Sequence, residues 1–330
     1  MIIEVRKNIE ASELEAMAMK YKAIVVEDYD RKLLVGSSSA KTIDTKDERH
    51  IEKHWVFDND MQLSSRKFMP NTRNISIGNF TTGKDETILI IGPCSVESEE
   101  QLEQTASLIQ KCGLKSLRAG AYKPRTSPYS FQGMGLEGLK LLAKMREKYG
   151  FSIVTEVRDS THADAVIEYA DVIQVGAKAM YDHGILRTCG KARKPVLLKR
   201  GFGTTIQEFV QAAEFILSGG NPNVMLCERG IRTFETKSRF TLDLCGVAYL
   251  KEHTNLPVIL DPSHAMGYAY GVPDLARACM AMNVDGLLIE VHPDPSVAKS
   301  DASQQLNHKQ FEELLNSLRP IAKAVGRHIV

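Results

Sequence analysis

From Thr87 to the C-terminal region, short apolar segments of strand length alternate with longer segments of helical periodicity. Most of the apolar segments are nearly continuous Val, Ile and Leu, as expected where both faces of a parallel sheet are covered. The predicted strands are Thr87–Ile91, Ser116–Ala119, Ser152–Val157, Val172–Val175, Val196–Lys199, Val224–Cys227, Val258–Leu260 and Gly286–Val291. Strands that alternate with helices in this number predict an α/β fold, a (β/α)8 TIM barrel.

Two of the intervening segments begin with a capping signal. Ser98 precedes Gln101 by three residues, and Thr205 precedes Glu208 in the same way. A Ser or Thr followed at this spacing by Glu or Gln is typical of a helix N-terminus. Both segments therefore predict helices, the second ending near Gly219.

The first sixty residues have a different pattern, in which short strands and helices do not alternate regularly. The predicted elements are a strand at Ile2–Arg6, a helix at Ala11–Tyr21, a hairpin of Ala23–Glu27 with Lys32–Gly36, a weak helix within Ser37–Arg49 and a strand at His54–Phe57. This order predicts a small ferredoxin-like α+β module. We therefore divide the chain into residues 1–60, a linker at 61–72 and a barrel at 73–330, with a hairpin at Asn74–Phe80 that covers the barrel floor.

Composition narrows the class of protein. Of the 330 residues 43% are hydrophobic and 25% are charged, and the formal net charge is +1, so no overall charge favours nucleic acid or an anionic membrane. No apolar run is long enough to span a bilayer. The six cysteines form no regular framework, which predicts reduced thiols and a cytoplasmic location.

Candidate chemistry lies where the predicted strands end, because the carboxyl ends of barrel strands form the active face. Three of these strands have the candidates at or just beyond their ends: Cys94, His264, Glu290 and Asp301. Singly, each has an ordinary structural explanation as a core residue, a loop cap, an ion-pair partner or a helix cap. Together they predict a site for a divalent transition metal, with Mn²⁺, Fe²⁺, Co²⁺ and Zn²⁺ all compatible with one thiolate, one imidazole and two carboxylates.

Basic residues surround the same predicted face. They are Arg118, Lys123, Arg125, Lys178, Lys199, Arg200, Arg229 and Arg232. Solvated loop charges are the alternative explanation, and it has equal weight for Arg200 and Arg232. As a set, the cations predict a polyanionic ligand such as two phosphates and a carboxylate.

These residues lie in segments that closely resemble 3-deoxy-D-arabino-heptulosonate 7-phosphate (DAHP) synthase, in its microbial subgroup with a small N-terminal regulatory domain. The matching segments are GPCSVES (92–98), LRAGAYKPRTSPYSFQG (117–133), VLLKRG (196–201), LCERGIRTFE (226–235), DPSHAMG (261–267) and EVHPDP with SDASQQL (290–306). A related family, 3-deoxy-octulosonate 8-phosphate synthase, shares the barrel and the metal chemistry but is not expected to contain KPRTSP.

The resemblance implies a transferase that condenses phosphoenolpyruvate with erythrose 4-phosphate to DAHP and phosphate, the first step of the shikimate pathway to aromatic amino acids. It implies that Cys94, His264, Glu290 and Asp301 bind the metal. It assigns the phosphoenolpyruvate carboxylate to Arg118 and Lys123, its phosphate to Lys199 and Arg229, and the aldose phosphate to Arg125 and Thr126, with Pro124, Ala177 and Lys178 also in the substrate site. Lys123 and His292 are both candidates for proton transfer.

Two departures from the family pattern keep other functions open. Lys178 stands where relatives usually have Arg, and Tyr268 with Ala269 stands where relatives often have two arginines. A related synthase acting on another aldose phosphate and a non-catalytic, metabolite-sensing barrel are the alternatives. The resemblance further implies an aromatic amino acid effector that acts through the N-terminal module, and a homotetramer or homodimer.

Overall fold

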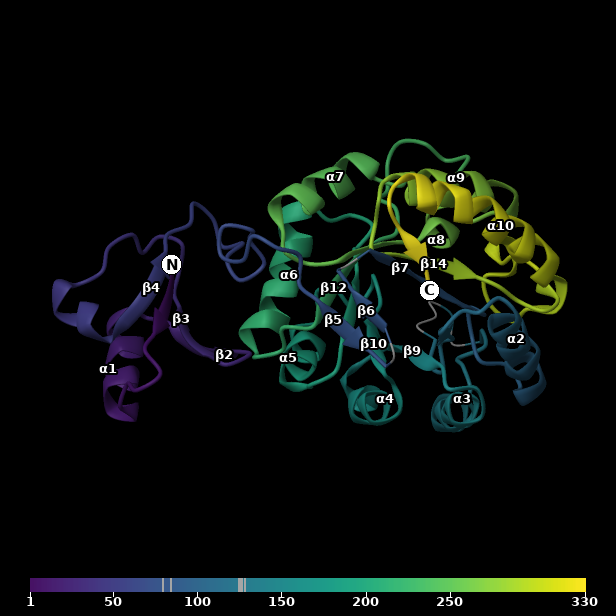
Figure 1. The fold of residues 1–330 in the computed structure, drawn as a ribbon. Helices are drawn as coiled ribbons and strands as arrows, with labels where there is room; N and C mark the ends of the chain where they lie inside the picture. The colour runs from purple at the N-terminus through teal and green to yellow at the C-terminus, as the bar shows by residue number, and fades with distance from the viewer. Residues whose placement is uncertain (79, 84, 124–126, 128) are drawn as a thin grey trace.

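The structure is a computed structural model, and it describes residues 1–78, 80–83, 85–123, 127 and 129–330. A small antiparallel sheet at the N-terminus lies beside a much larger barrel (Figure 1). The predicted fold class is therefore confirmed.

The barrel is a closed parallel sheet. Its strands, in chain order and in neighbouring positions, are β7 (Glu86–Gly92), β8 (Ser116–Arg118), β9 (Ser152–Val157), β10 (Val172–Val175), β11 (Val196–Lys199), β12 (Val224–Glu228), β13 (Val258–Leu260) and β14 (Gly286–Glu290). Pairing of β14 with β7, from Gly286 opposite Ile88 to Glu290 opposite Gly92, closes the ring. Each predicted strand forms, with ends that differ by at most one residue, because long buried Val/Ile/Leu runs mark these strands well.

Helices surround the barrel (Figure 1). They are α2 (Glu99–Lys111), α3 (Gly135–Tyr149), α4 (Ala163–Tyr169), α5 (His183–Lys191), α6 (Ile206–Ser218), α7 (Leu244–His253), α8 (Pro262–Met266), α9 (Val272–Ala281) and α10 (His308–Ala324). The capping box that the sequence predicts at Thr205 and Glu208 is present in full. At α2 only half of it forms: Ser98 caps Gln101, but the Gln101 side chain accepts from the backbone of Glu97.

Side chains alternate between the barrel interior and the surrounding helices, as the period of two along a strand requires. The interior cluster of apolar side chains consists of Ile88, Ile90, Val154, Val172, Leu197, Met225, Cys227, Ile259 and Leu288. Ile75, Ile77 and Phe80 pack against this cluster from β5 (Ile75–Ile77) and β6 (Phe80–Thr82). The predicted hairpin thus covers the barrel floor and leaves the opposite end free for the site.

The N-terminal sheet contains β1 (Ile2–Val5), β2 (Ile24–Asp28), β3 (Arg31–Val35) and β4 (Ile51–Trp55), in the order β2-β3-β1-β4, with α1 (Ala11–Lys20) packed on one face. This order is the predicted ferredoxin-like one. The weak second helix expected within Ser37–Arg49 is instead a short 3-10 helix, Thr45–His50, which has no buried residue. Without an apolar face, that segment cannot be held as a longer helix against the sheet.

The segment that joins the two parts is packed rather than solvated. Met61, Gln62, Leu63 and Ser64 are all buried. The Glu214 carboxylate on α6 accepts hydrogen bonds from the backbone N–H groups of residues 62, 63 and 64. The connection is therefore anchored on the barrel surface.

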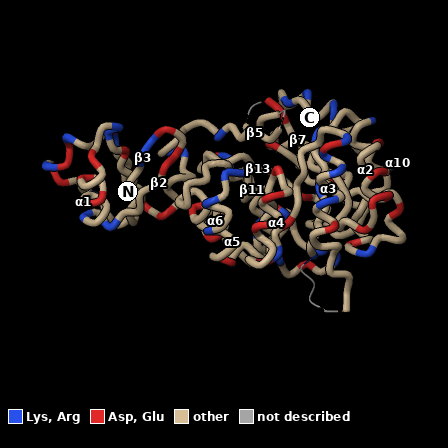
Figure 2. Tube along the Cα trace, turned by 90° about the horizontal axis from the view of Figure 1, so that it is seen from below, with Lys and Arg blue, Asp and Glu red and all other residues tan. Residues whose placement is uncertain are grey.

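A buried ion pair also joins the two parts. Arg73 donates to Asp28 at the end of β2, with Nη1 to Oδ1 at 3.0 Å, and to Asn255 of the barrel, with Nε to Oδ1 at 2.9 Å. Arg31 holds the other oxygen of Asp28. Elsewhere Lys/Arg and Asp/Glu are interspersed along both parts of the chain (Figure 2), in keeping with the small net charge.

A final short strand, β15 (His328–Ile329), pairs with the start of β7 and was not predicted. It is only two residues long, which is too short for any periodicity to mark. Among the described residues, no helix combines the length and the apolar character needed to cross a membrane.

The ion pair between Asp28 and Arg73 predicts a large stability effect. Replacing Asp28 by Ala leaves the guanidinium groups of Arg73 and Arg31 without their buried carboxylate partner. This change should lower the free energy of unfolding by about 3 kcal/mol. Urea unfolding followed by circular dichroism measures this loss. Asp30→Ala is the matched control, because Asp30 pairs with Lys7 in full solvent and its loss should leave the urea midpoint unchanged. Equal midpoints for the two variants would contradict the assignment.

Candidate active site

Closure of the barrel brings the first two predicted metal ligands together. Gly92 pairs with Glu290 across β7 and β14, and Cys94 follows Gly92 by two residues. Gly92 has a φ of 146°, and a Cβ at this position would lie 2.1 Å from the carbonyl oxygen of Arg118. Only glycine fits there, so the chain can turn sharply and place the Cys94 side chain beside Glu290.

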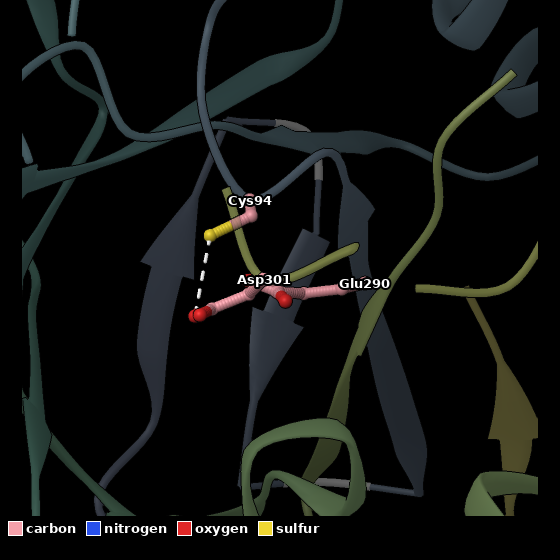
Figure 3. A group of neighbouring side chains, drawn as sticks. All are labelled: Cys94, Glu290 and Asp301. Atoms are coloured by element: carbon pink, nitrogen blue, oxygen red, sulfur yellow. Dashed lines mark hydrogen bonds between the residues drawn. The ribbon is translucent and has the colours of Figure 1, made fainter. Parts of the chain in front are cut away.

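Four potential metal ligands converge at this end of the barrel, and Figure 3 shows three of them, Cys94, Glu290 and Asp301. One ligand atom from each of Cys94, Glu290 and Asp301 lies within 4.8 Å of the other two. Cys94 Sγ is 3.6 Å from Asp301 Oδ2, and His264 Nε2 is 3.3 Å from Glu290 Oε1. Thiolate, imidazole and carboxylate groups so close together, and largely buried, fit a divalent transition metal.

His264 is oriented by a carboxylate behind it. Its Nδ1 lies 2.8 Å from Oδ2 of Asp261, which also caps α8. Burial lowers the pKa of His264, although Asp261 and Glu290 oppose this shift. The ring is therefore neutral, with Nδ1–H directed to Asp261 and Nε2 directed to the other ligands, which is a common arrangement for metal-binding histidines.

The thiol of Cys94 is protonated when no metal is bound. Burial, followed by the nearby Glu290 carboxylate, raises the pKa of Cys94 to about 12. Lys123 lies close by, with Nζ 3.1 Å from Cys94 Sγ. Binding of a cation would supply the charge that this buried thiolate needs.

Two of the predicted cations are held by neighbouring carboxylates inside the barrel mouth. Arg118 donates to Glu290 over 2.6 Å and to Gln174 over 3.2 Å, whereas its buried Nη2 has no hydrogen-bond partner. Lys199 lies 2.5 Å from Asp261. These contacts fix the side chains while leaving donors available.

Arg229 differs from Arg118 and Lys199 because it is buried and no acidic side chain among the described residues forms an ion pair with it. Its Nε and Nη1 lie in the interior and have no hydrogen-bond partner. Its guanidinium stacks 4.4 Å from the ring centroid of Phe240. Burial lowers the pKa of Arg229, because it makes the charged form of the guanidinium costly. An anion beside Arg229 would remove this cost.

These groups line one cleft of about 240 Å³. It is lined by Lys123, Glu156, Gly176, Ala177, Lys178, Lys199, Phe202, Arg229, Arg239, Phe240, His264 and Asp301. Arg239 and Phe240 come from the long loop between β12 and α7, where composition gave no signal. Glu156 is the next-to-last residue of β9, and its position near a strand end could have identified it.

Some predicted residues lie elsewhere. His292 lies outside the residues that line this cleft, in a neighbouring hollow, with its Nε2 3.7 Å from Glu97. Arg200 is buried and pairs with Glu228 and Asp243. It is therefore neither a solvated loop charge nor a cation available to the substrate. Arg232 stacks on Phe202 at the edge of the site. Pro124, Arg125 and Thr126 fall outside the described residues.

A (β/α)8 barrel whose mouth combines a candidate metal site with buried cations is typical of enzymes that act on phosphorylated substrates. Residues 60–326 match the DAHP synthetase I family, and the chain belongs to that family. The resemblance inferred from the sequence motifs is therefore confirmed.

Individual relatives agree with this assignment. The chain is 45% identical over 265 residues to phospho-2-dehydro-3-deoxyheptonate aldolase of Thermotoga maritima, covering 80% of this chain and 78% of the relative. The crystal structure of the Thermotoga maritima DAHP synthase has a TM-score of 0.82 and 37% identity, and covers 100% of this chain and 99% of that one. Identity to 2-dehydro-3-deoxyphosphooctonate aldolase 1 of Arabidopsis thaliana is lower, 34% over 258 residues, covering 71% of this chain and 88% of the relative.

The raised pKa of Cys94 predicts a pH-dependent metal affinity. Because the thiol must lose its proton on binding, the affinity for Co²⁺ should rise about tenfold per pH unit between pH 6 and 8. Titration of the metal-free protein, followed by the sulfur-to-cobalt absorption band, measures this slope. Cys94→Ser should abolish the band, whereas Cys245→Ser, at an exposed position, should preserve it. A pH-independent affinity would show that Cys94 does not bind the metal.

Proposed function

We propose that this chain condenses phosphoenolpyruvate with erythrose 4-phosphate to form DAHP and inorganic phosphate. The observation that carries the proposal is the pairing of a candidate metal site with an unpaired, buried Arg229 in one cleft. Family membership and the higher identity to a DAHP synthase than to an octulosonate enzyme support erythrose 4-phosphate as the aldose.

Different cations would bind the two anionic groups of phosphoenolpyruvate. Arg229 and Lys199 would hold its phosphate, with Lys178 adding charge at the cleft edge. Arg118 and Lys123 would hold its carboxylate, since Arg118 Nη2 makes no hydrogen bond to the described residues and lies 3.8 Å from Glu156 Oε2. Binding of both anionic groups would orient C3 toward the metal ligands. The positive charge of the same residues would offset the repulsion between the two anionic substrates.

Cys94, His264, Glu290 and Asp301 are proposed to hold the metal. A divalent transition metal, when bound, supplies a Lewis acid that polarises the aldehyde of the aldose. C3 of phosphoenolpyruvate then attacks the aldehyde carbon, water adds at C2, and the resulting hemiketal phosphate releases inorganic phosphate.

Lys123 is the proton-transfer residue that the geometry favours. It lines the cleft and its Nζ lies 3.1 Å from Cys94 Sγ, which supports a role for its ammonium in stabilising charge that would develop on an aldehyde oxygen near the metal ligands. His292 lacks this access because it lines the neighbouring hollow. We therefore assign the proton donor for the new hydroxyl to Lys123.

The N-terminal sheet is proposed to be regulatory, with an aromatic amino acid as effector. Its attachment through Asp28 and Arg73 supports this role, since a buried contact can transmit a shift to the barrel. We further propose division of the chain at residues 1–60, 61–72 and 73–330, a homo-oligomer, either tetramer or dimer, and a cytoplasmic location that keeps the six cysteines reduced.

The reaction predicts a specific pattern of phosphate release. Purified protein with phosphoenolpyruvate and erythrose 4-phosphate should release inorganic phosphate, and a chelator should stop the release until Co²⁺ or Mn²⁺ is added. Arabinose 5-phosphate, an aldose phosphate that is one carbon longer, should react at least about tenfold more slowly. Preference for arabinose 5-phosphate would overturn the assignment, and absence of turnover with either aldose would indicate a non-catalytic barrel.

Removal of residues 1–60 should separate catalysis from regulation. We expect the truncated protein to keep its phosphate release, whereas inhibition of the full chain by tyrosine or phenylalanine should be lost. Initial rates across an inhibitor titration measure both properties. Asp30→Ala in the full chain is the control, since this exposed change should leave inhibition intact. Inhibition that survives the deletion would place the effector site on the barrel.

A further inference from the structure

Two adjacent glutamines follow the last candidate metal ligand. Asp301 adopts a left-handed conformation with a φ of 43°, and a 3-10 turn, Ala302–Gln304, comes next. The chain then runs alongside β14: Leu306 donates to the Glu290 carbonyl, and His292 donates to the Leu306 carbonyl, each over 2.9 Å. This pairing fixes the backbone that carries Gln304 and Gln305.

Gln304 connects the Glu290 carboxylate to Arg239. Its Nε2 donates to Glu290 Oε2 over 2.6 Å, and its Oε1 accepts from Arg239 Nη1 over 2.8 Å. Arg239 Nη1 in turn lies 3.6 Å from Asp301 Oδ2. One oxygen of Glu290 is thereby committed to Gln304, while Oε1 faces Arg118 and His264.

Gln305 connects the two ends of the ligand set. Its Oε1 accepts from the backbone N–H of Cys94 over 3.0 Å, and its Nε2 donates to the carbonyl of Ser300 over 2.9 Å. The hydroxyls of Ser95 and Ser300 lie 2.6 Å apart and strengthen the same connection. The backbones that carry Cys94 and Asp301, far apart in the sequence, are therefore joined by a single side chain.

We infer that Gln304 and Gln305 are positioning residues that hold Cys94, Glu290 and Asp301 in place before a metal binds; this inference rests on the proposed metal site. Both glutamines are almost fully buried, and each uses its amide as donor and acceptor together. A carboxylate between Glu290 and Arg239 would repel Glu290, and an apolar side chain would satisfy neither partner. An amide is the neutral group that bridges a carboxylate and a guanidinium.

The consequence concerns metal affinity more than fold. Residues that orient metal ligands typically change affinity by about 10- to 100-fold when removed. Without Gln304 the Glu290 carboxylate loses the hydrogen bond that fixes its Oε2. Without Gln305 the loop that carries Asp301 loses its hydrogen bond to the Cys94 backbone, and the contact between Ser95 and Ser300 holds it less firmly. In each variant the ligands become ordered only when the metal binds, and this ordering makes the binding free energy less favourable.

The test uses the metal-free full chain and Co²⁺ as the probe. Gln304→Met and Gln305→Met keep the side-chain length but remove the amide, and Gln207→Met, on the exposed face of α6, is the matched control. Titration against a competing chelator should show about 10- to 100-fold weaker Co²⁺ binding for the first two variants only. The sulfur-to-cobalt band should also shift in Gln305→Met, because that change releases the Cys94 backbone.

A purely structural role gives a different result: a lower melting temperature of the metal-free variants with wild-type Co²⁺ affinity, and that outcome would overturn the inference. If a variant is unfolded without metal, the Co²⁺ concentration that restores a cooperative unfolding transition is measured in place of the titration. A concentration equal to that of the wild-type chain again counts against the inference. Failure of the wild-type chain to bind Co²⁺ would instead contradict the proposed metal site, and with it the inference.

Discussion

The pairing of β14 with β7 is the constraint on which the rest of the structure depends. It closes the barrel and sets Glu290 opposite Gly92. Because the chain turns at Gly92, where any Cβ would meet the Arg118 carbonyl, Cys94 lies beside Glu290. A slip of one residue in this pairing would turn Glu290 away from the barrel interior and separate the candidate ligands. The chemistry of the site is thus a consequence of strand register.

The barrel mouth contains more buried charge than stability alone would favour. The interior side chains change from an apolar layer on the floor side to a polar layer at the carboxyl ends of the strands, which includes Arg118, Glu156, Gln174, Lys199 and Glu290. Most of these charges offset one another in close pairs, as buried charges must. Among the described residues no acidic side chain pairs with Arg229, so an anionic substrate could compensate its charge.

Much of this arrangement could be predicted from the sequence, because buried parallel strands have long runs of Val, Ile and Leu and end in chemically distinctive residues. Cys94, His264, Glu290 and Asp301 were found in this way, and so were Lys199 and Arg229. Arg239 and the roles of Gln304 and Gln305 were not, since they depend on how loops fold back over the barrel. The division between His292 and Lys123 likewise depends on how the loops beyond β14 and β8 fold: Lys123 lines the cleft and His292 lines a neighbouring hollow, and periodicity at a strand end does not reveal this.

The exposure of Lys178 explains how the family pattern can change there without loss of the site. A Cβ at Gly176 would lie 2.2 Å from Glu156 Oε1, so the backbone before Lys178 is packed closely against the cleft wall. Lys178 itself is exposed at the edge. An exposed cation acts mainly through its charge, which lysine keeps, whereas the planar fork of arginine matters most where water is excluded. The buried cation beside Phe240 in the same cleft is an arginine, Arg229, and a lysine at the exposed position 178 is therefore compatible with an active enzyme.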